Sequence, residues 1–460
     1  MKQYEIVIIG AGPGGYVAAI KAAQMGAKVA IVEKNELGGV CLNWGCIPTK
    51  TLLKNAKVYE NILNSEKYGI DIENKNTITI NWPNMQKRKE QVVKRLTGGV
   101  KMLLEKNGVD IYDGYGEIID KNTIKVNEET LHVENLIIAT GSSPRIPNID
   151  GIKEAIENGY VLTSKGILEL SEIPKELIVI GAGVVSIEFA TLYNSLGSNV
   201  TILQRSEGIL SSIDKDVSKT MARILKRNGV KIVYGASIEK IDNNKVIVNI
   251  KGESKEFTGD KILISVGRTP NINGLEKLGL EIDKRGIVTN ERLETSVKGV
   301  YAIGDVNGKY LLAHVASAEG IIAVENILGK DSKIEYRKVP SCIYGFPEIG
   351  VVGMTEEDAK EKGHEIIVST FPLSANGKAL AEGESEGFVK IVADKEYGEI
   401  LGVHILAPNA TDMIAEAVTT MELEGTVHEL AKAIHPHPTL SEIIMEAAHG
   451  AIDSPIHMLK

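Results

Sequence analysis

A repeated strand–glycine turn–helix–strand pattern constrains the fold of this chain more than any other sequence feature. The first copy spans Glu5–Glu33, with "EIVIIG", "GAGPGG" and a helical stretch before "KVAIVE". The second spans Glu176–Gln204, with "ELIVIG", "GAGVVS" and a helical stretch before "NVTILQ". Gly10 is separated from Glu33 by the same number of residues as Gly181 from Gln204, which indicates an internal repeat of one βαβ unit. Parallel strands joined by a helix need a sheet covered on both faces, so we expect an α/β fold.

The first glycine turn matches the fingerprint G-x-G-x-x-G of a dinucleotide site. Gly10 would form the tight turn, Gly12 would let the backbone approach a pyrophosphate, and Gly15 would allow close helix–strand packing. Gly14 lies in the same turn. The pyrophosphate would then lie at the positive end of the following helix. Glu33 ends the second strand, where a carboxylate can accept a hydrogen bond from a ribose hydroxyl.

The second glycine turn matches the fingerprint less completely. Gly181 and Gly183 are in place, but Ser186 occupies the third position, where a small side chain is tolerated at modest packing cost. Gln204 and Arg205 stand where the first copy has its acid. An amide can bind a ribose hydroxyl and an arginine can bind a 2′-phosphate, so NAD and NADP both stay open, and Arg205 is equally well read as a solvated surface charge. Two dinucleotide sites in one chain suggest a flavin coupled to a nicotinamide.

Two of the three cysteines, Cys41 and Cys46, lie in the glycine-rich stretch "GGVCLNWGCIPTK". One continuous helix would place them ~140° apart and ~7.5 Å along the axis, which is poor disulfide geometry. Pro48 suits the first turn of a helix. We therefore expect a bent segment at Cys41 and a helix that begins near Cys46, where the positive helix end stabilises a thiolate. Lys50, one turn on, could lie on the same side.

A thiol pair of unequal reactivity beside a two-electron carrier indicates a redox disulfide. Half of a zinc site is the competing interpretation, but it needs more ligands, and the remaining Cys342 has no C-x-x-C partner, so no metal is expected. The third interpretation is that both cysteines are inert buried thiols.

Length and charge limit the remaining classes. A chain of 460 residues suggests about three domains, and a net charge of −9 argues against a nucleic-acid surface. No apolar run approaches the ~20 residues of a membrane span. The first strand begins almost at once and leaves no room for a signal peptide, so we expect a cytoplasmic protein. Proline- and glycine-containing clusters at Ala139–Gly151, Ser265–Gly274 and Lys338–Gly350 suggest boundaries, and the last opens a region with a predicted hairpin at 387–406 and a helix at 410–425.

Seven motifs together resemble those of the flavoprotein disulfide reductases, over essentially the whole chain. They are "GAGPGGYVAAI", "GGVCLNWGCIPTK", "ATGSSP", "GAGVVSIE", "VYAIGD", "LLAHVASAEG" and "HPHPTLSE". Val40 and Trp44 depart from the threonine and valine that are usual in that family. The resemblance implies an α/β protein with two Rossmann-like dinucleotide-binding domains and a C-terminal α+β dimerisation domain. The expected segments are 1–143 for FAD binding with the redox pair, 144–270 for NAD(P) binding, 271–339 for a central domain completing the FAD site, and 340–460 for dimerisation.

The resemblance also implies roles for individual residues. Cys41 would be the interchange thiol and Cys46 the flavin-facing one, with Lys50 and Glu188 as a charged pair beside the flavin. Asp305 would bind the ribityl chain, and His314 lies in a segment expected to contact the flavin through its backbone. The other expected cofactor contacts are Ala139, Thr140, Gly141, Gly304 and Ala313 for FAD and Gly267 for the nicotinamide.

The stretch "HPHPTLSE" offers the proton acceptor that thiol–disulfide exchange needs, because only a thiolate attacks. Histidine suits this task near neutral pH. Glu442, at the start of an expected helix, could orient His437 through the other ring nitrogen. The resemblance selects the same pair and implies a homodimer in which His437 completes the site of the other subunit. His435 is expected to be structural or to lie at the entrance.

Among family members, the resemblance is strongest to those that oxidise protein-bound dihydrolipoamide with FAD and NAD, NADP being the alternative. The implied partner is the lipoyl domain of a 2-oxoacid dehydrogenase, acetoin or glycine cleavage complex. A related reductase such as glutathione reductase is the nearest rival. Mercuric reductase and the large thioredoxin reductase are disfavoured, because the C-terminus lacks a cysteine pair. A non-catalytic thiol protein of the same fold is the alternative from another class.

Overall fold

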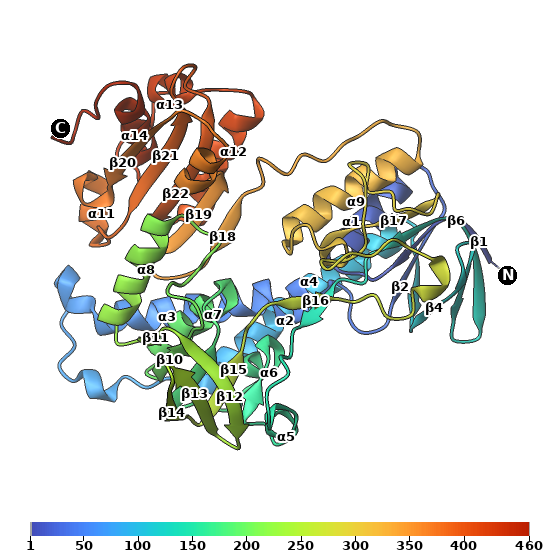
Figure 1. Ribbon diagram of the computed structural model, residues 1–460, viewed down its shortest axis with the longest axis horizontal. Coiled ribbons are helices and arrows are strands. Elements are labelled where there is room, and N and C mark those ends of the chain that lie inside the picture. The colour runs from blue at the N-terminus through green and yellow to red at the C-terminus, as the bar shows by residue number, and fades with distance from the viewer. Residues whose placement is uncertain (1, 460) are drawn as a thin grey trace.

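The computed structural model describes residues 2–459 and confirms both copies of the βαβ repeat (Figure 1). In each copy the two strands pair in parallel, with Ile6 opposite Val29 in the first and Glu176 opposite Asn199 in the second. The first strand begins earlier than the predicted Glu5, because Lys2 already pairs with the neighbouring strand. The elements are β1 (Lys2–Ile9), α1 (Pro13–Gln24) and β2 (Val29–Glu33), then β9 (Glu176–Ile180), α7 (Val184–Ser195) and β10 (Asn199–Leu203).

The first sheet has seven strands in the order β3-β2-β1-β6-β5-β4, with β17 also paired to β6. β17 comes from much later in the chain and pairs in parallel with the end of β6. Helix α9 packs against α1, and glycine permits the close approach: a Cβ on Gly320 would lie 2.6 Å from the carbonyl oxygen of Gly14. The added elements are β3 (Asp110–Asp113), β4 (Gly116–Asp120), β5 (Thr123–Val126), β6 (Glu129–Ile138), β17 (Val300–Ala302) and α9 (Ala313–Ile327).

The second sheet has five parallel strands in the order β11-β10-β9-β15-β8, beside an antiparallel sheet of β12, β13 and β14. The two strands β7 and β16 pair with each other where the chain passes between the two repeats (Figure 1). The elements here are β7 (Ser142–Pro144), α5 (Ile152–Glu157), β8 (Val161–Leu162), α6 (Ser164–Leu168), α8 (Lys215–Arg227), β11 (Lys231–Val233), β12 (Ala236–Asp242), β13 (Lys245–Ile250), β14 (Glu253–Thr258), β15 (Lys261–Ile264) and β16 (Arg268–Pro270).

The cysteine turn is held between the two repeats. It forms α2 (Gly39–Trp44) and the start of α3 (Cys46–Leu63), which packs against α4 (Trp82–Lys106) and against α7 of the second repeat. Leu52 and Leu53 of α3 share one buried core with Phe189 and Tyr193 of α7. Burial of these large side chains fixes the cysteine-bearing helix against the second repeat.

The C-terminal region is a separate five-stranded antiparallel sheet in the order β18-β19-β22-β21-β20 with helices packed against it (Figure 1). The predicted hairpin is β21 and β22, and the predicted helix is α12. Every residue of β22 is buried. The bounds are β18 (Ser341–Ile343), β19 (Glu348–Gly353), α10 (Glu356–Glu361), β20 (Ile366–Pro372), α11 (Gly377–Glu382), β21 (Phe388–Asp394), β22 (Ile400–Ala407), α12 (Ala410–Glu422), α13 (Val427–Lys432) and α14 (Glu442–Ile452).

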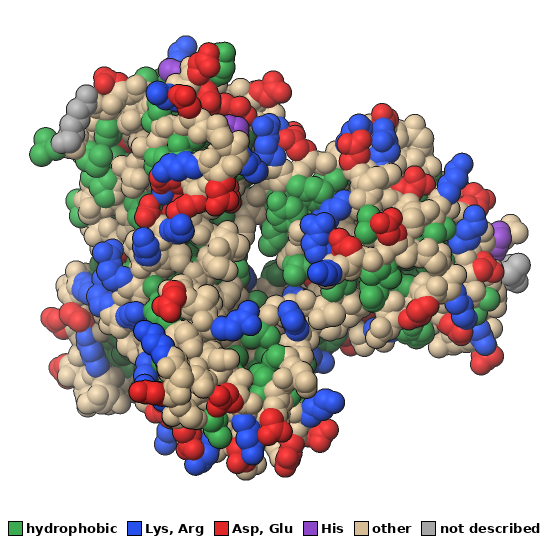
Figure 2. Space-filling model, viewed as in Figure 1, with side chains coloured by type: hydrophobic (Ala, Val, Ile, Leu, Met, Phe, Trp, Pro, Cys, Tyr) green, Lys and Arg blue, Asp and Glu red, His purple; other side chains and the backbone are tan. Residues whose placement is uncertain are grey.

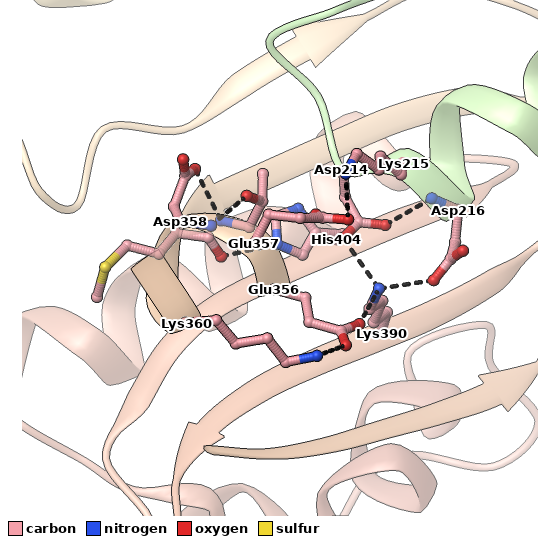
Figure 3. A network of polar contacts seen from close by, with 11 residues as sticks. Asp214, Lys215, Asp216, Glu356, Glu357, Asp358, Lys360, Lys390 and His404 are labelled. Atoms are coloured by element: carbon pink, nitrogen blue, oxygen red, sulfur yellow. Dashed lines mark hydrogen bonds and ion pairs between the residues drawn. The ribbon is translucent and has the colours of Figure 1, made fainter. Parts of the chain in front are cut away.

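An ion-pair cluster around a buried lysine joins this region to the second repeat (Figure 3). Lys390 of β21, whose side chain is only 3% exposed, lies 3.0 Å from Asp214, 2.7 Å from Asp216 and 2.9 Å from Glu356. Asp214 caps the start of α8, so the lysine ties α8 to the C-terminal sheet.

Charges of both signs are interspersed over the face drawn in Figure 2. Within residues 2–459, no helix combines the length and apolar character needed to cross a bilayer.

Candidate active site

The cysteine turn is two helices separated by a break at Gly45. The helix predicted near Cys46 begins at Cys46, but the bend expected at Cys41 lies at Gly45 (φ −140°, ψ −113°), and Cys41 lies inside the short α2. A Cβ on Gly45 would lie 3.0 Å from the carbonyl oxygen of Val40, so the two helices can turn this tightly because the residue is glycine. The break brings the two sulfurs together, which one continuous helix would prevent.

Cys41 and Cys46 are both half-buried thiols, hydrogen-bonded to each other through their side chains. The pKa of Cys46 is lowered to about 7, mainly by that bond and also by the charge of Lys50, although burial and Glu188 oppose the change. The same bond, together with burial, raises the pKa of Cys41 far above its usual value. The thiols therefore differ in reactivity, and Cys46 at the helix start is the one that carries thiolate character near neutral pH.

Lys50 and Glu188 form a charge pair one turn from Cys46. The Lys50 Nζ lies 2.9 and 2.8 Å from the two carboxylate oxygens of Glu188. Glu188 comes from α7 and its side chain is only 5% exposed. Its Oε1 also accepts the backbone N–H of Tyr344 at 3.1 Å. Nothing in the sequence signals this third partner, which comes from the C-terminal region.

His437 and Glu442 are joined as expected from the sequence. The Nδ1 of His437 lies 2.9 Å from Oε1 of Glu442, and Oε2 accepts the backbone N–H of Thr439 at 2.8 Å. Burial alone would raise the pKa of Glu442, but the bonds from Thr439 and His437 outweigh it and lower the pKa. The carboxylate is thus held ionised against one ring nitrogen, which leaves the other free to exchange a proton.

His435 is held inside the fold. Its Nε2 lies 2.6 Å from Glu416 and its Nδ1 is 3.0 Å from the carbonyl oxygen of Ala433. The hydrogen bond with Glu416 is the main cause of its raised pKa. These contacts favour the structural alternative for His435.

The acid–base pair and the cysteines lie in different parts of the molecule. Figure 1 shows α14, which begins at Glu442, well away from α2. Within the described chain, no hydrogen bond or ion pair links His437 to either cysteine. The side chain of His437 is 78% exposed, so it can be presented to another molecule.

The first glycine turn has the shape of a dinucleotide cradle. Gly10 (φ +103°) and Gly15 are required by the fold, because a Cβ would lie 2.2 Å from the oxygen of Ala139 and 1.8 Å from that of Gly10, respectively. Gly12 has ordinary backbone angles, and its nearest neighbour would be 3.9 Å from a Cβ. The fold itself does not need glycine there, so the open space at the start of α1 fits the approach of a pyrophosphate. Glu33 accepts the backbone N–H of Ala11 at 2.7 Å and so lies beside the turn.

The second turn repeats this arrangement. Gly181 (φ +102°) is required by the fold, because a Cβ would lie 2.3 Å from the oxygen of Ser265, whereas a Cβ on Gly183 would meet nothing within 4 Å. Ser186 is fully buried, as a small third residue must be. The amide nitrogen of Gln204 donates to Ser206 at 2.6 Å and to the oxygen of Gly208 at 3.1 Å. Arg205 is exposed.

The other expected FAD contacts surround the junction of β6 and β17. Ala139, Thr140 and Gly141 follow β6 directly, and Gly304, Asp305 and Ala313 follow β17. Asp305 accepts the hydroxyl of Ser142, whose oxygen also accepts Arg268 Nε at 2.6 Å. The backbone N–H of Gly304 donates to the buried Glu319. Ser142, Arg268 and Glu319 were not predicted as site residues, although Ser142 and Glu319 lie within the motifs "ATGSSP" and "LLAHVASAEG" and Arg268 follows Gly267.

The remaining expected residues have simpler surroundings. Gly267 (φ +110°) would meet nothing within 4 Å if it carried a Cβ. The ring of His314 bonds the carbonyl oxygen of Pro340 at 2.9 Å. Burial raises the pKa of Cys342 to about 11, which makes it a poor nucleophile. Among residues 2–459, no cluster of three or more His, Cys, Asp or Glu side chains is arranged to hold a metal ion.

The sequence also matches the models of a known protein family over most of its length. Residues 4–320 match the model of the pyridine nucleotide-disulphide oxidoreductases, and residues 339–448 match the dimerisation domain of the same family. The chain belongs to this family, and it carries the family's dimerisation domain.

Individual relatives are similar over nearly the full length. The dihydrolipoyl dehydrogenase of Geobacillus stearothermophilus is 43% identical, covering 99% of this chain and 98% of that relative. One from Bacillus subtilis (strain 168) is 44% identical, covering 100% and 98%. Among solved structures, the HOCl-induced flavoprotein disulfide reductase RclA from Escherichia coli is 30% identical with a TM-score of 0.86, covering 97% of this chain and 99% of that one.

Proposed function

We propose that this chain is a dihydrolipoyl dehydrogenase, which oxidises protein-bound dihydrolipoamide to lipoamide and reduces NAD⁺. The observation that carries the proposal is the pair Cys41–Cys46, with its sulfurs in contact and unequal in acidity, beside the charge pair Lys50–Glu188. The relatives that are 43–44% identical over nearly the whole chain bear the same name.

We propose that the segments expected from the sequence have separate tasks. We assign residues 1–143 to FAD binding and the redox pair, 144–270 to NAD(P) binding, 271–339 to completing the FAD site, and 340–460 to dimerisation. In support, β17 pairs within the first sheet although it lies at 300–302, as a segment that completes a site in that sheet would.

The reaction begins when a thiolate of the substrate dithiol attacks Cys41 in the oxidised disulfide Cys41–Cys46. The Cys41–Cys46 bond breaks, a mixed disulfide with Cys41 forms, and Cys46 leaves as the thiolate that its low pKa favours. The second substrate thiol then attacks its own partner sulfur in the mixed disulfide, releasing lipoamide and Cys41 as a thiol. His437, oriented by Glu442, accepts the proton lost by the dithiol.

The cofactor assignments rest on the two glycine turns. Gly10, Gly12, Gly14, Gly15 and Glu33 would hold FAD with the segments after β6 and β17, while Gly181, Gly183, Gln204 and Gly267 would hold the nicotinamide cofactor. Arg205 would contact that cofactor only through a 2′-phosphate. FAD, when bound, supplies the two-electron relay between the cysteine pair and the nicotinamide. Lys50 and Glu188 would lie beside it and hold the charge balance near Cys46.

The nicotinamide preference follows from the hydrogen bonds of Gln204. Its amide nitrogen is used by Ser206 and Gly208, so only its carbonyl oxygen is left, which can accept a ribose hydroxyl but not bind a phosphate. We therefore propose NAD over NADP. Replacing Arg205 with alanine should leave kcat/KM for NAD⁺ nearly unchanged. The proposal would be wrong if the unmodified chain had similar kcat/KM values for NAD⁺ and NADP⁺ and the variant lost only the activity with NADP⁺, because the arginine would then bind a 2′-phosphate.

The partners are a second copy of the chain and a lipoyl domain. Because His437 is exposed and remote from the cysteines of its own chain, we propose that it completes the site of the other subunit. The lipoyl domain would belong to a 2-oxoacid dehydrogenase, acetoin or glycine cleavage complex.

Steady-state turnover of the FAD-loaded protein tests the proposal. We expect dihydrolipoamide with NAD⁺ to give the highest kcat/KM among dihydrolipoamide and glutathione with either nicotinamide. Faster reduction of glutathione disulfide by NADPH would replace the proposal with the glutathione reductase alternative.

A further inference from the structure

Tyr344 contacts both members of the charge pair beside the cysteines. It follows β18 in the C-terminal region, while Lys50 lies on α3 and Glu188 on α7. Its backbone N–H donates to Glu188 at 3.1 Å, and the Lys50 Nζ lies over its ring, 4.5 Å from the centroid. A residue of the C-terminal region therefore contacts both members of a charge pair that joins α3 to α7.

The ring suits this position chemically. Burial raises the pKa of Tyr344 to about 12, so the phenol is neutral near pH 7 and presents an uncharged aromatic face. Such a face attracts an ammonium, more strongly when the contact is shielded from water. The Lys50 side chain is 27% exposed, and its Nζ contacts both the ring and the two carboxylate oxygens.

The place of this ammonium matters for Cys46. Lys50 and Glu188 act on the thiol in opposite directions, since the cation favours the thiolate and the carboxylate disfavours it. The net effect depends on where the ammonium lies relative to the carboxylate and the sulfur. Contacts that fix both partners at once therefore set the balance at Cys46.

We propose that Tyr344 is a positioning residue of the redox pair, which holds the Lys50 ammonium where its charge acts on the Cys46 sulfur. This inference rests on the proposed function only for the redox role of that sulfur. Through Tyr344, the C-terminal region takes part in tuning a thiol that the first repeat carries.

The test measures thiol acidity rather than turnover. In the reduced FAD-loaded protein, the rate of alkylation of Cys46 by iodoacetamide, followed by mass spectrometry of its peptide, reports the thiolate fraction at each pH. We expect a midpoint near 7 in the unmodified chain. In Tyr344→Leu the midpoint should rise, because an ammonium no longer held against the ring stabilises the thiolate less. Tyr344→Phe keeps the ring and should match the unmodified chain.

A double-variant cycle checks the route of the effect. Lys50→Met should itself raise the midpoint, and adding Tyr344→Leu should then change nothing further. If Tyr344→Leu does not fold, as judged by circular dichroism, Tyr344→Met makes the same test. Three results would each overturn the proposal. The midpoint of Cys46 could be unchanged in Tyr344→Leu, or Tyr344→Phe could shift it as far as Tyr344→Leu does. Tyr344→Leu could also shift it fully in the Lys50→Met background. Because no lipoamide is used, failure to oxidise dihydrolipoamide would count against the proposed function alone.

Discussion

At the scale of single residues, the two cysteines are chemically distinct although they contact each other. Cys46 has the lower pKa and Cys41 the higher, which suits Cys46 to leave as a thiolate and Cys41 to form the mixed disulfide. We therefore predict that Cys41→Ser abolishes oxidation of dihydrolipoamide but leaves FAD bound and reducible by NADH. Absorbance spectra before and after NADH, with a turnover assay, measure both effects. Normal turnover in this variant would exclude Cys41 as the interchange thiol.

His437 is the residue for which acid–base catalysis predicts the largest loss. His437→Ala should lower kcat by at least ~10²-fold, because the substrate dithiol loses its proton acceptor. His364, another exposed histidine of the same region, provides the matched control, and His364→Ala should turn over normally. Near-normal turnover in His437→Ala would remove it from the mechanism.

The charge pair beside the cysteines was only partly predictable from the sequence. Helical spacing placed Lys50 one turn after Cys46, and both residues lie in the first turns of α3. Glu188 could be named only through the family motif. Tyr344 could not be predicted at all, because it acts on Glu188 through a backbone N–H across 156 residues of chain, and every residue except proline has such a group.

At the scale of elements, local signals predicted the long or strongly patterned segments. Pro48 and the sequence after it placed the start of α3 at Cys46, and the glycine fingerprints placed α1 and α7. The short helix α2 was missed, since so few residues cannot form a helix without the packing around them. The contact of α9 with α1 was not predicted either, because it joins segments remote in the sequence.

That contact makes Gly320 a sensitive position. Gly320→Ala should destabilise the protein and weaken FAD binding, because its Cβ would press on the oxygen of Gly14 in the nucleotide turn. Gly98→Ala in α4 is the matched control: its Cβ meets nothing within 4 Å, so alanine should stabilise the helix by roughly 0.5–1 kcal/mol. Denaturant unfolding and FAD titration measure the two effects. Equal behaviour of the two variants would contradict the packing argument.

At the scale of the whole molecule, the repeat predicted two parallel sheets, but not how the C-terminal sheet is attached. The cluster around Lys390 makes one such attachment, and sequence offers no signal for it, because the lysine and its carboxylates come from β21, α10 and the start of α8. The buried Lys390–Asp214 pair satisfies two charges that neither region could bury alone.

Loss of Lys390 should therefore destabilise the chain strongly. Lys390→Met leaves Asp214 buried without its cation, and breaking such a pair costs about 3–5 kcal/mol of unfolding free energy. Lys395→Met, which removes only an exposed pair with Glu365, should change it by less than ~1 kcal/mol. Urea unfolding of both FAD-loaded variants measures the difference, and a small effect at Lys390 would show that the regions are held together by other contacts.

The same cluster predicts a defined dependence of stability on acid. Hydrogen bonds from Lys360 and then Lys390 lower the pKa of Glu356 from 4.5 to about 2, and the pKa of Asp214 is lowered because Lys390 outweighs the effect of burial. Carboxylates with lowered pKa values bind protons less readily in the folded chain than in the unfolded one, so their contribution is present above pH 4.5 and is lost as the pH falls toward 2. Burial lowers the pKa of the neighbouring His404 from its ordinary value of 6.5, so this imidazole binds a proton less readily in the folded chain than in the unfolded one and adds to the loss of stability in acid. The unfolding free energy should thus decrease as the pH falls from 4.5 toward 2. Its slope against pH should be shallower in Lys390→Met than in Lys395→Met. Equal slopes in the two variants would exclude the cluster as the acid-sensitive link between the second repeat and the C-terminal sheet.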